Sequence, residues 1–343
     1  MKKFYFLAMA LIAGTIAANA IVGELPGRFT INAQGDTVHF SQGNLQYNAL
    51  QKYWSFAEKQ YKKDDQDLLT YFAFGTSGWN SGANEYQPYS TSTESSDYYV
   101  GGSWENGLTG DYANADWGIY NAILNGGNRA GLWRVLTMDE WIYILAKREN
   151  AAKLFSMGTI KWTDSWDNKV YKYEGLILLP DNWVKPEGAK NFLPATQYGL
   201  TLVEEAGGEL YQNSNLDLQA FTLNTYTREE WEIMEEAGAV FLPALGYAFG
   251  LDLRSSGHGV YISSTPQSAN QICVLDFNSW DVETPWNPRA GGYSVRLVTR
   301  ENKGQGVDNV QSDKVQSTKV IRDGQVLILR DGKTFNLLGT ELR

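Results

Sequence analysis

Residues 132–143, with the sequence LWRVLTMDEWIY, carry the clearest folding signal in the chain. Thr137 and Glu140 have the spacing of a capping box, in which each side chain bonds to the other residue's backbone N–H. The segment therefore predicts a helix that begins after Thr137. At helical spacing after this cap come three apolar residues that we expect to face a core: Trp141, Ile144 and Leu145.

A second capping box is predicted at Thr227 and Glu230. Trp231 and Met234 would form the inner stripe of this helix. Gly238 follows it as the residue expected to end the helix, since glycine adopts the left-handed conformation required there.

Residues 110–118, GDYANADWG, predict a third short helix capped by Asp116 and ended by Gly126-Gly127. An alternative is a structural calcium site built from the oxygens of Asp111, Asn114 and Asp116, although the EF-hand loop pattern is absent. The side chains expected to point inward from the helix are Ile119, Tyr120 and Ile123.

Short strands are predicted between and beyond these helices. Several alternate apolar and polar residues, as half-buried antiparallel strands do. Few helices, small antiparallel sheets and long loops rich in Gly, Tyr and Asn together predict an α+β fold. The expected strands are residues 29–32, 38–41, 176–179, 240–242, 259–264, 272–277 and 293–298.

The two ends of the chain differ from the rest. Lys2 and Lys3, an apolar stretch and an A-x-A site ending at Ala20 predict a secretory signal peptide over residues 1–20. We therefore expect a secreted or surface-exposed protein cleaved near Ala20, without a membrane span in the mature chain. Residues 21–300 form the expected body, and residues 301–318 an expected linker poor in apolar side chains.

Residues 319–343 contain three strand-like runs separated by Asp323-Gly324 and Asp331-Gly332. Asp-Gly is a strong hairpin signal, so a three-stranded meander is predicted. A sheet of this size is too small to be stable alone and should be bound or recognised by something else.

Composition excludes several functions. The chain of 343 residues has 29 Lys+Arg against 39 Asp+Glu, a net charge of −10, which argues against nucleic acid and anionic membranes as partners. One cysteine excludes a disulfide framework and a cysteine zinc cluster. We expect no cofactor beyond the calcium alternative.

The sequence offers little for catalysis. His39 falls in a predicted strand and His258 in a turn, and no G-x-S-x-G motif is present. Paired carboxylates for glycoside hydrolysis remain an alternative, with Asp276, Asp281 and Glu283 as the candidates. Their simpler interpretation is loop and edge charges. Cys273 lies in an apolar run and is expected to be buried.

The tryptophans divide into two groups. Trp54, Trp117 and Trp133 join the helix tryptophans as expected core residues. Tryptophans in polar loops suit recognition of a sugar face or a protein epitope, because a rigid ring is combined with hydrogen-bonding neighbours. The loop tryptophans are Trp79, Trp104, Trp280 and Trp286.

Several segments resemble one family. Residues 132–143, 260–265 (VYISST) and 292–298 (GYSVRLV) resemble segments of formylglycine-generating-enzyme-like domains. Residues 40–47 (FSQGNLQY), with 115–118 (ADWG) and 238–243 (GAVFLP), resemble secreted paralogous surface proteins of the FISUMP type. The resemblance implies a C-type-lectin-like fold. It does not imply catalysis, because those enzymes use a pair of cysteines and this chain has one.

In related proteins of this fold, ligands contact the segment between the motif that matches residues 260–265 and the motif that matches residues 292–298. In this chain that segment is residues 261–289. Its Asn, Ser, Gln and Trp residues resemble those of antibody binding sites. Alternate residues should instead enter the core: Ile262, Ile272, Val274, Leu275 and Phe277. The expected ligand-binding residues are Tyr261, Ser263, Thr265, Gln267, Asn270, Gln271, Asn278, Trp280, Trp286 and Asn287.

Residues 319–339 resemble the end of the C-terminal sorting modules of type IX secretion, which implies secretion machinery as a partner. The sequence as a whole predicts an adhesin-like binding protein for a glycan or protein ligand. The alternatives are an enzyme on the same fold, such as a carbohydrate-active one, and a structural subunit of a surface assembly.

Overall fold

The computed structural model divides into two units, Met1–Glu301 and Asn302–Arg343, which are described separately. The expected signal peptide, residues 1–20, and most of the expected linker, residues 301–316, lie outside the described residues. The structure describes residues 21–61, 68–88, 90–164, 166–198, 201–204, 210–213, 220–254, 257–300, 317–322, 325–330, 333–335 and 341–342.

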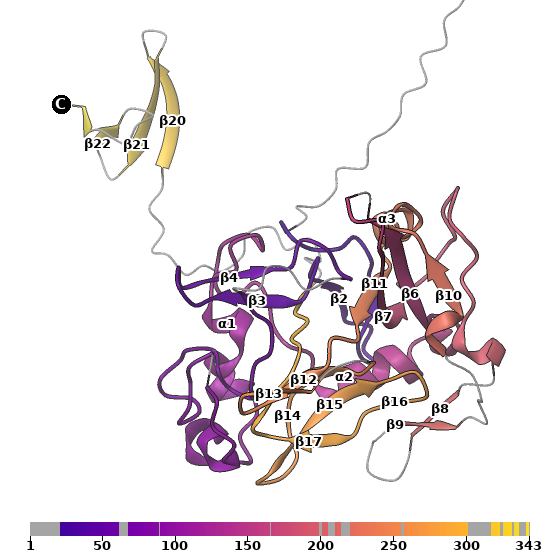
Figure 1. Cartoon of the computed structure of the whole chain (residues 1–343). Coiled ribbons are helices and arrows are strands. Elements are labelled where there is room, and N and C mark those ends of the chain that lie inside the picture. Colours follow the sequence, from indigo (N-terminus) through magenta and orange to yellow (C-terminus); the bar gives the residue numbers. More distant parts are fainter. Residues whose placement is uncertain are drawn as a thin grey trace, which may run out of the picture. The chain divides into compact units, whose positions relative to one another are not determined.

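The first unit has an α+β fold with short helices and several small sheets (Figure 1). Its α-helices are α1 (Trp117–Tyr120), α2 (Met138–Ile142) and α3 (Arg228–Glu236), and a π-helical turn, Tyr143–Lys147, continues α2. The 3-10 turns are Ser95–Tyr98, Val100–Gly102, Gly110–Ala115, Ala151–Lys153, Ala195–Tyr198 and Ala220–Thr222.

The described part of the first unit contains six small sheets. Three of the sheets have three strands each. The first contains β1 (Phe29–Thr30), β2 (Thr37–Phe40) and β19 (Val298–Arg300), and the second β3 (Leu45–Asn48), β4 (Tyr53–Phe56) and β5 (Leu68–Leu69). The third contains β12 (Tyr247–Phe249), β13 (Asp252–Arg254) and β18 (Gly291–Gly292). Two have four strands each: β6 (Phe155–Thr163), β7 (Val170–Leu178), β10 (Asn224–Tyr226) and β11 (Val240–Pro243); β14 (Gly259–Pro266), β15 (Gln271–Phe277), β16 (Val282–Glu283) and β17 (Trp286–Pro288). The sixth pairs β8 (Thr201–Glu204) with β9 (Leu210–Asn213).

Both capping boxes are confirmed. Thr137 Oγ1 accepts from the Glu140 backbone N–H at 3.2 Å, and the Glu140 carboxylate accepts from the Thr137 N–H at 2.9 Å. Thr227 and Glu230 form the same pair of bonds at the start of α3. The side chains expected to face a core are all buried: Trp141, Ile144, Leu145, Trp231 and Met234.

Gly238 follows α3 with φ +96°, as predicted for the residue after a helix. A Cβ at this position would lie 2.5 Å from the Gly27 Cα, so the close approach of two backbones also requires glycine here.

The third predicted helix is shorter than expected. Asp116 caps α1 by accepting from the Gly118 N–H at 2.9 Å, but α1 ends at Tyr120. Asn121 has extended backbone with ψ 147°, and its side-chain amide donates to the Trp117 carbonyl, which ends the helix before Gly126-Gly127. Tyr120 is 41% exposed, so its expected inward position is wrong.

Six of the seven expected strands have counterparts in β1, β2, β7, β11, β14 and β15. The strand expected over residues 293–298 is wrong, because this segment bonds to several partners in turn. The Tyr293 N–H donates to Phe72, the Ser294 N–H to Val260, and the Leu297 carbonyl accepts from Ser41. Regular structure resumes only at β19.

Strand β14 lies inside the body and is covered on both faces. Its residues 259–264 are all buried, with Tyr261 packed in one apolar cluster and Val260 and Ile262 in another. The expected core residues of the neighbouring strand are confirmed, as are the expected core tryptophans: Ile272, Val274, Leu275, Phe277, Trp54, Trp117 and Trp133.

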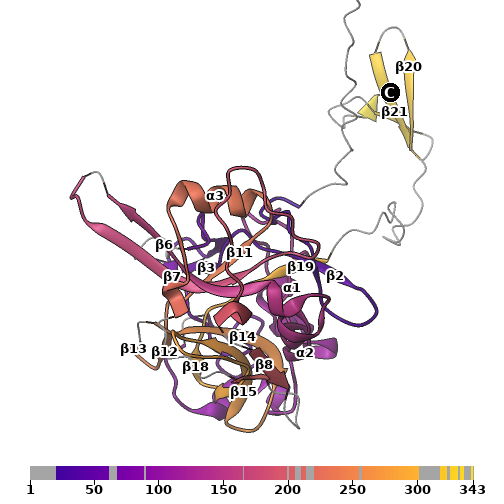
Figure 2. The same ribbon diagram turned by 90° about the vertical axis from the view of Figure 1, so that its right-hand side faces the viewer.

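The β6–β7 hairpin extends from the rest of its sheet (Figure 2). Trp162 and Tyr171 stack across it with ring centroids 5.5 Å apart, and the Arg228 guanidinium lies 3.7 Å from the Trp162 centroid. Trp166, beyond β6, is 96% exposed.

The second unit contains an antiparallel sheet of β20 (Ser317–Arg322), β21 (Gln325–Arg330), β22 (Lys333–Phe335) and β23 (Glu341–Leu342), in this order. Arg322 pairs with Gln325 and Arg330 with Lys333, so the two Asp-Gly pairs fall between consecutive strands as predicted. The fourth strand was not expected. Within the described parts of the chain, no helix has the length and apolar character to cross a membrane.

Candidate functional site

The pocket closest to the predicted surface lies between the sheet of β12, β13 and β18 and the sheet of β14 to β17. Its volume is about 680 Å³, a size suited to a small ligand. We call it the aromatic pocket. Its lining residues are Tyr247, Phe249, Leu253, Arg254, His258, Asp276, Asn287, Pro288 and Tyr293.

Two tyrosines form a fixed wall of the aromatic pocket. The rings of Tyr247 and Tyr293 have centroids 6.1 Å apart, inclined by 36°. The Tyr293 hydroxyl donates to the Pro288 carbonyl at 2.8 Å, which holds the ring in place. Burial raises the pKa of Tyr293, so this hydroxyl remains a proton donor at neutral pH.

Three polar side chains meet at the opposite side. The Asp276 carboxylate lies 3.4 Å from His258 Nδ1 and accepts from the Asn287 amide at 3.3 Å. Burial raises the pKa of Asp276, while the Asn287 hydrogen bond and the nearby His258 act in the opposite direction. Asp276 can therefore accept hydrogen bonds from a ligand, and Asn287 holds it in one orientation.

One predicted binding residue lines this pocket, and others lie in or next to the strands of the sheet of β14 to β17. Asn287 lines it directly, and its neighbour Trp286 is 43% exposed. Trp280 is 48% exposed beyond the end of β15. Asn270 is exposed, and four further predicted residues are half-buried: Thr265, Gln267, Gln271 and Asn278.

Tyr261 and Ser263 are not available to a ligand, which corrects the prediction for both. Each is 0% exposed. The Tyr261 hydroxyl donates to the Pro243 carbonyl and accepts from Asn44, while Ser263 donates to the Cys273 carbonyl at 2.7 Å. Both residues belong to the doubly covered strand β14.

Thr265 has a structural role as well. Its hydroxyl accepts from the Met138 N–H at 3.0 Å, at the first residue of α2. Gln267 accepts from the buried Cys273 thiol at 3.5 Å. These contacts fix the end of β14 and leave the more exposed Asn270, Trp280 and Trp286 as the better candidates for ligand contact.

The sequence reasoning missed Tyr247, Phe249 and Arg254, which come from the β12–β13 hairpin. Ala248 pairs with Leu253, and Gly250, at φ +59°, lies in the tight connection. Two short runs around a glycine, as in residues 247–254 (YAFGLDLR), are a hairpin signal that could have found these residues.

The predicted calcium residues have other bonds. Both oxygens of Asp116 accept backbone hydrogen bonds, from Gly118 and Val135, and burial raises the pKa of Asp116 to about 6. Asp111 is exposed. The described residues contain no group of three or more His, Cys, Asp or Glu side chains placed to hold a metal ion.

Among the alternative catalytic carboxylates, only Asp276 lines the aromatic pocket. Asp281 is exposed and Glu283 half-buried near the β15–β16 turn. His39 lies in β2, with Nδ1 3.1 Å from the Leu25 carbonyl, away from this site.

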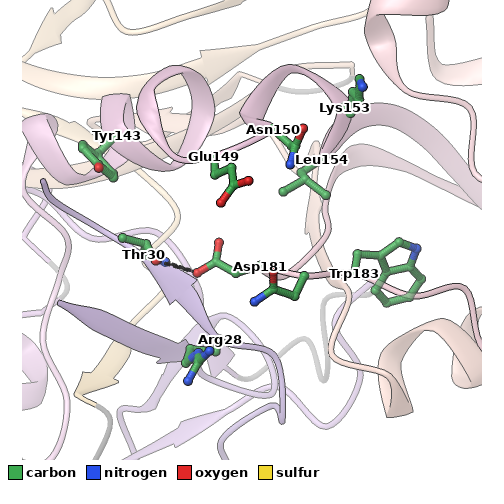
Figure 3. A pocket seen from close by; sticks show the side chains of 10 residues that line it. Arg28, Thr30, Tyr143, Glu149, Asn150, Lys153, Leu154, Asp181 and Trp183 are labelled. Atoms are coloured by element: carbon green, nitrogen blue, oxygen red, sulfur yellow. Dashed lines mark hydrogen bonds between the residues drawn. The ribbon is translucent and has the colours of Figure 1, made fainter. Parts of the chain in front are cut away.

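A second concavity, which we call the carboxylate pocket, lies between the end of the π-helical turn and the loop after β7 (Figure 3). Its volume is about 540 Å³. It shares no lining residue with the aromatic pocket. Its lining residues are Arg28, Thr30, Tyr143, Glu149, Asn150, Lys153, Leu154, Asp181, Asn182 and Trp183.

The chain was compared with family models, curated proteins and solved structures. No family model, curated protein or solved structure matches it. The function proposed for the site therefore depends on its geometry and on the sequence itself.

Proposed function

We propose that this protein is a secreted or cell-surface binding protein, adhesin-like, that recognises a glycan through the aromatic pocket and its rim. The observation that supports this most is the lining of the pocket, which combines the half-buried ring of Tyr247, packed on the buried ring of Tyr293, with the carboxylate of Asp276 and the amide of Asn287.

This lining matches the chemistry of a sugar. A pyranose has an apolar C–H face, which packs on aromatic rings, and hydroxyl groups that bond to planar polar side chains. Arg254 and His258 add further hydrogen-bonding groups at the edge of the pocket. Trp286, which precedes Asn287 in β17 and is 43% exposed, adds an indole to the rim on the same strand.

The proposal includes a C-type-lectin-like fold of the FISUMP type. The α+β architecture and the two confirmed capping boxes are compatible with it. Export would use the signal peptide at residues 1–20, and residues 319–343 would serve as a type IX sorting module. The paired cysteines of the formylglycine-generating enzymes have no counterpart, since Cys273 is the one cysteine.

A glycan array and a panel of surface proteins, screened with the full chain with and without calcium, test this function. Trp286→Ala and Asn287→Ala should each weaken a specific glycan hit at least fivefold. Trp166→Ala removes an indole from the β6–β7 hairpin that is 96% exposed, against 43% for Trp286, and is the control. A hit on a protein alone, or no hit by a well-folded chain, would overturn glycan recognition.

The His258–Asp276 pair keeps a carbohydrate-active enzyme as the second candidate, because a carboxylate of raised pKa in a pocket suits general acid–base work. Incubation of any bound glycan with the protein, followed by analysis of its chain length, distinguishes the two. An unchanged glycan supports binding alone, and shortened products lost in Asp276→Asn support catalysis.

A further inference from the structure

The carboxylate pocket continues into a second hollow. The neighbouring depression, of about 280 Å³, shares Arg28, Asp181, Asn182 and Trp183 with it. The two hollows therefore adjoin, and we call them together the 28/182 groove after two residues that line both. A groove of this form suits a linear ligand better than a single small ring.

The floor of the 28/182 groove is fixed by a buried ion pair. Arg148 Nη1 lies 3.0 Å from the Asp181 carboxylate, and the Arg148 side chain is 1% exposed. The other oxygen of Asp181 accepts from the backbone N–H and the hydroxyl of Thr30, both at 2.7 Å. This set of bonds joins β1, the turn after α2 and the loop after β7.

Backbone groups next to the groove already have hydrogen-bond partners within the protein. The Asp181 N–H donates to the Arg28 carbonyl at 2.8 Å, and the Thr30 N–H is bonded to the Asp181 side chain. An extended peptide that added itself to β1 would need these backbone groups. The groove therefore offers side chains, not a free strand edge, to a ligand.

The lining charges balance. Arg28 and Lys153 supply two cations, and Glu149 and Asp181 two carboxylates. In Figure 3 the carboxylates of Glu149 and Asp181 point into the space between the helical turn and the loop, and Lys153 lies at its edge. A ligand without net charge fits this lining, with hydroxyls that donate to Glu149, while Asp181 already accepts from Arg148 and Thr30.

Two asparagines provide free amides. Asn150 and Asn182 have left-handed backbone, with φ 56° and 55°, and both are exposed. Neither side-chain amide bonds to another residue in the described part of the chain. The indole of Trp183 borders both hollows and supplies an apolar surface.

We propose that the 28/182 groove is a second binding site, for a neutral linear oligosaccharide. Hydroxyl groups of the sugar bond to Glu149 and the two asparagine amides, and a sugar face packs on Trp183. This site does not depend on the glycan proposed for the aromatic pocket, with which it shares no residue.

Titration calorimetry of the full chain tests the groove. The probes are linear hexasaccharides of glucose, mannose, galactose and xylose, with oligogalacturonate as the acidic comparison. At least one neutral probe should bind, with an affinity that does not change between low and high salt. Binding of the acidic probe alone, or of no probe, would overturn the proposal.

Asn182→Gly and Asn150→Gly remove the amides while keeping a residue that tolerates the left-handed backbone. Each substitution should weaken the affinity for the neutral hexasaccharide at least threefold. Asn168→Gly is the matched control, since Asn168 has φ 54° on the distant β6–β7 hairpin. Equal losses in all three variants would contradict the groove as the site.

Asn287→Ala separates the two proposals. If the groove binds its own ligand, this variant of the aromatic pocket leaves the affinity for the hexasaccharide unchanged. If Asn287→Ala abolishes that binding, the probe occupies the aromatic pocket and the groove proposal is wrong. Array hits that persist undiminished in Asn287→Ala would instead contradict the function proposed for the aromatic pocket.

Discussion

The aromatic pocket and the 28/182 groove are held by different forces. In the aromatic pocket, close packing of Tyr247 and Tyr293 sets the wall, and one hydrogen bond to Pro288 fixes it. In the groove, the Arg148–Asp181 ion pair joins three separate segments. The first site should therefore respond most to changes in volume, and the second to changes in charge.

The largest effect is expected at the floor of the groove. Arg148→Met leaves Asp181 without its counter-charge and the Leu179 carbonyl without its donor. Because breaking a buried ion pair is strongly destabilising, the free energy of unfolding should fall by about 3–5 kcal/mol in denaturant titrations. Lys59→Met breaks an exposed pair with Glu232 and should cost under about 1 kcal/mol. Equal losses of unfolding free energy in Arg148→Met and Lys59→Met would show that the buried ion pair stabilises the fold no more than the exposed one.

The corresponding steric change is Gly291→Ala in the aromatic pocket. An added Cβ would lie 2.2 Å from the Tyr293 hydroxyl, so the ring must move. Overpacking of this kind costs about 1–3 kcal/mol, measurable by thermal unfolding, and should also weaken the ligand of this pocket. At the next residue, Gly292→Ala meets its nearest atom at 3.3 Å and should cost less. If Gly292→Ala cost more stability than Gly291→Ala, close packing would not be what positions the Tyr293 ring.

A smaller effect concerns pH. The pKa of Asp276 is raised in the folded protein, so the unfolded chain ionises this carboxylate more easily. Its contribution to stability is therefore greatest at low pH and declines as pH rises from 3.8 through the raised pKa. Asp276→Asn should gain stability relative to the parent over that window and match it at lower pH.

Thermal melts between pH 3 and 7 measure this difference. Asn287→Ala provides the opposite comparison, because it removes a hydrogen bond that lowers the pKa of Asp276. Its stability should decline more steeply with pH than that of the parent chain. If the stability difference between each variant and the parent chain did not change with pH, burial of Asp276 would not affect folding.

The smallest effect on stability is expected at the rim. Trp166→Ala should change the free energy of unfolding by less than about 0.5 kcal/mol, since its side chain is 96% exposed, and Trp286→Ala, at a side chain 43% exposed, should cost about 1 kcal/mol. Trp133→Ala, at a fully buried indole, should cost about 3–5 kcal/mol in the same titration. A large loss in Trp286→Ala would make that residue structural and weaken its assignment to ligand binding.

Local signals in the sequence predicted local structure well. The capping boxes at Thr137 and Thr227 were predicted from side-chain spacing alone, because each depends on residues three positions apart. The positions of Tyr261 and Ser263 were wrong, because alternation along a strand assumes that one face is exposed. Strand β14 is covered on both faces, which a single strand's sequence does not reveal.

Both pockets depend on contacts that no local pattern encodes. His258 and Asp276 are 18 positions apart, and Thr30 and Asp181 are 151 positions apart. The pairing of β14 with β15 brings His258 next to Asp276, and the bond from the Asp181 N–H to the Arg28 carbonyl holds the loop after β7 beside β1. The sequence analysis could therefore predict the α+β class and part of the pocket rim, but not the Arg148–Asp181 floor of the groove.

The position of Cys273 makes its thiol a probe of how often the pairing of β15 with β17 opens. It is the one cysteine of the chain, 6% exposed in β15, opposite Trp286 across the β15–β17 pairing. A thiol reagent can reach its sulfur only when these strands separate. The rate of thiol modification would therefore measure how often this sheet opens, and a ligand that closes over the β15–β17 edge would slow it.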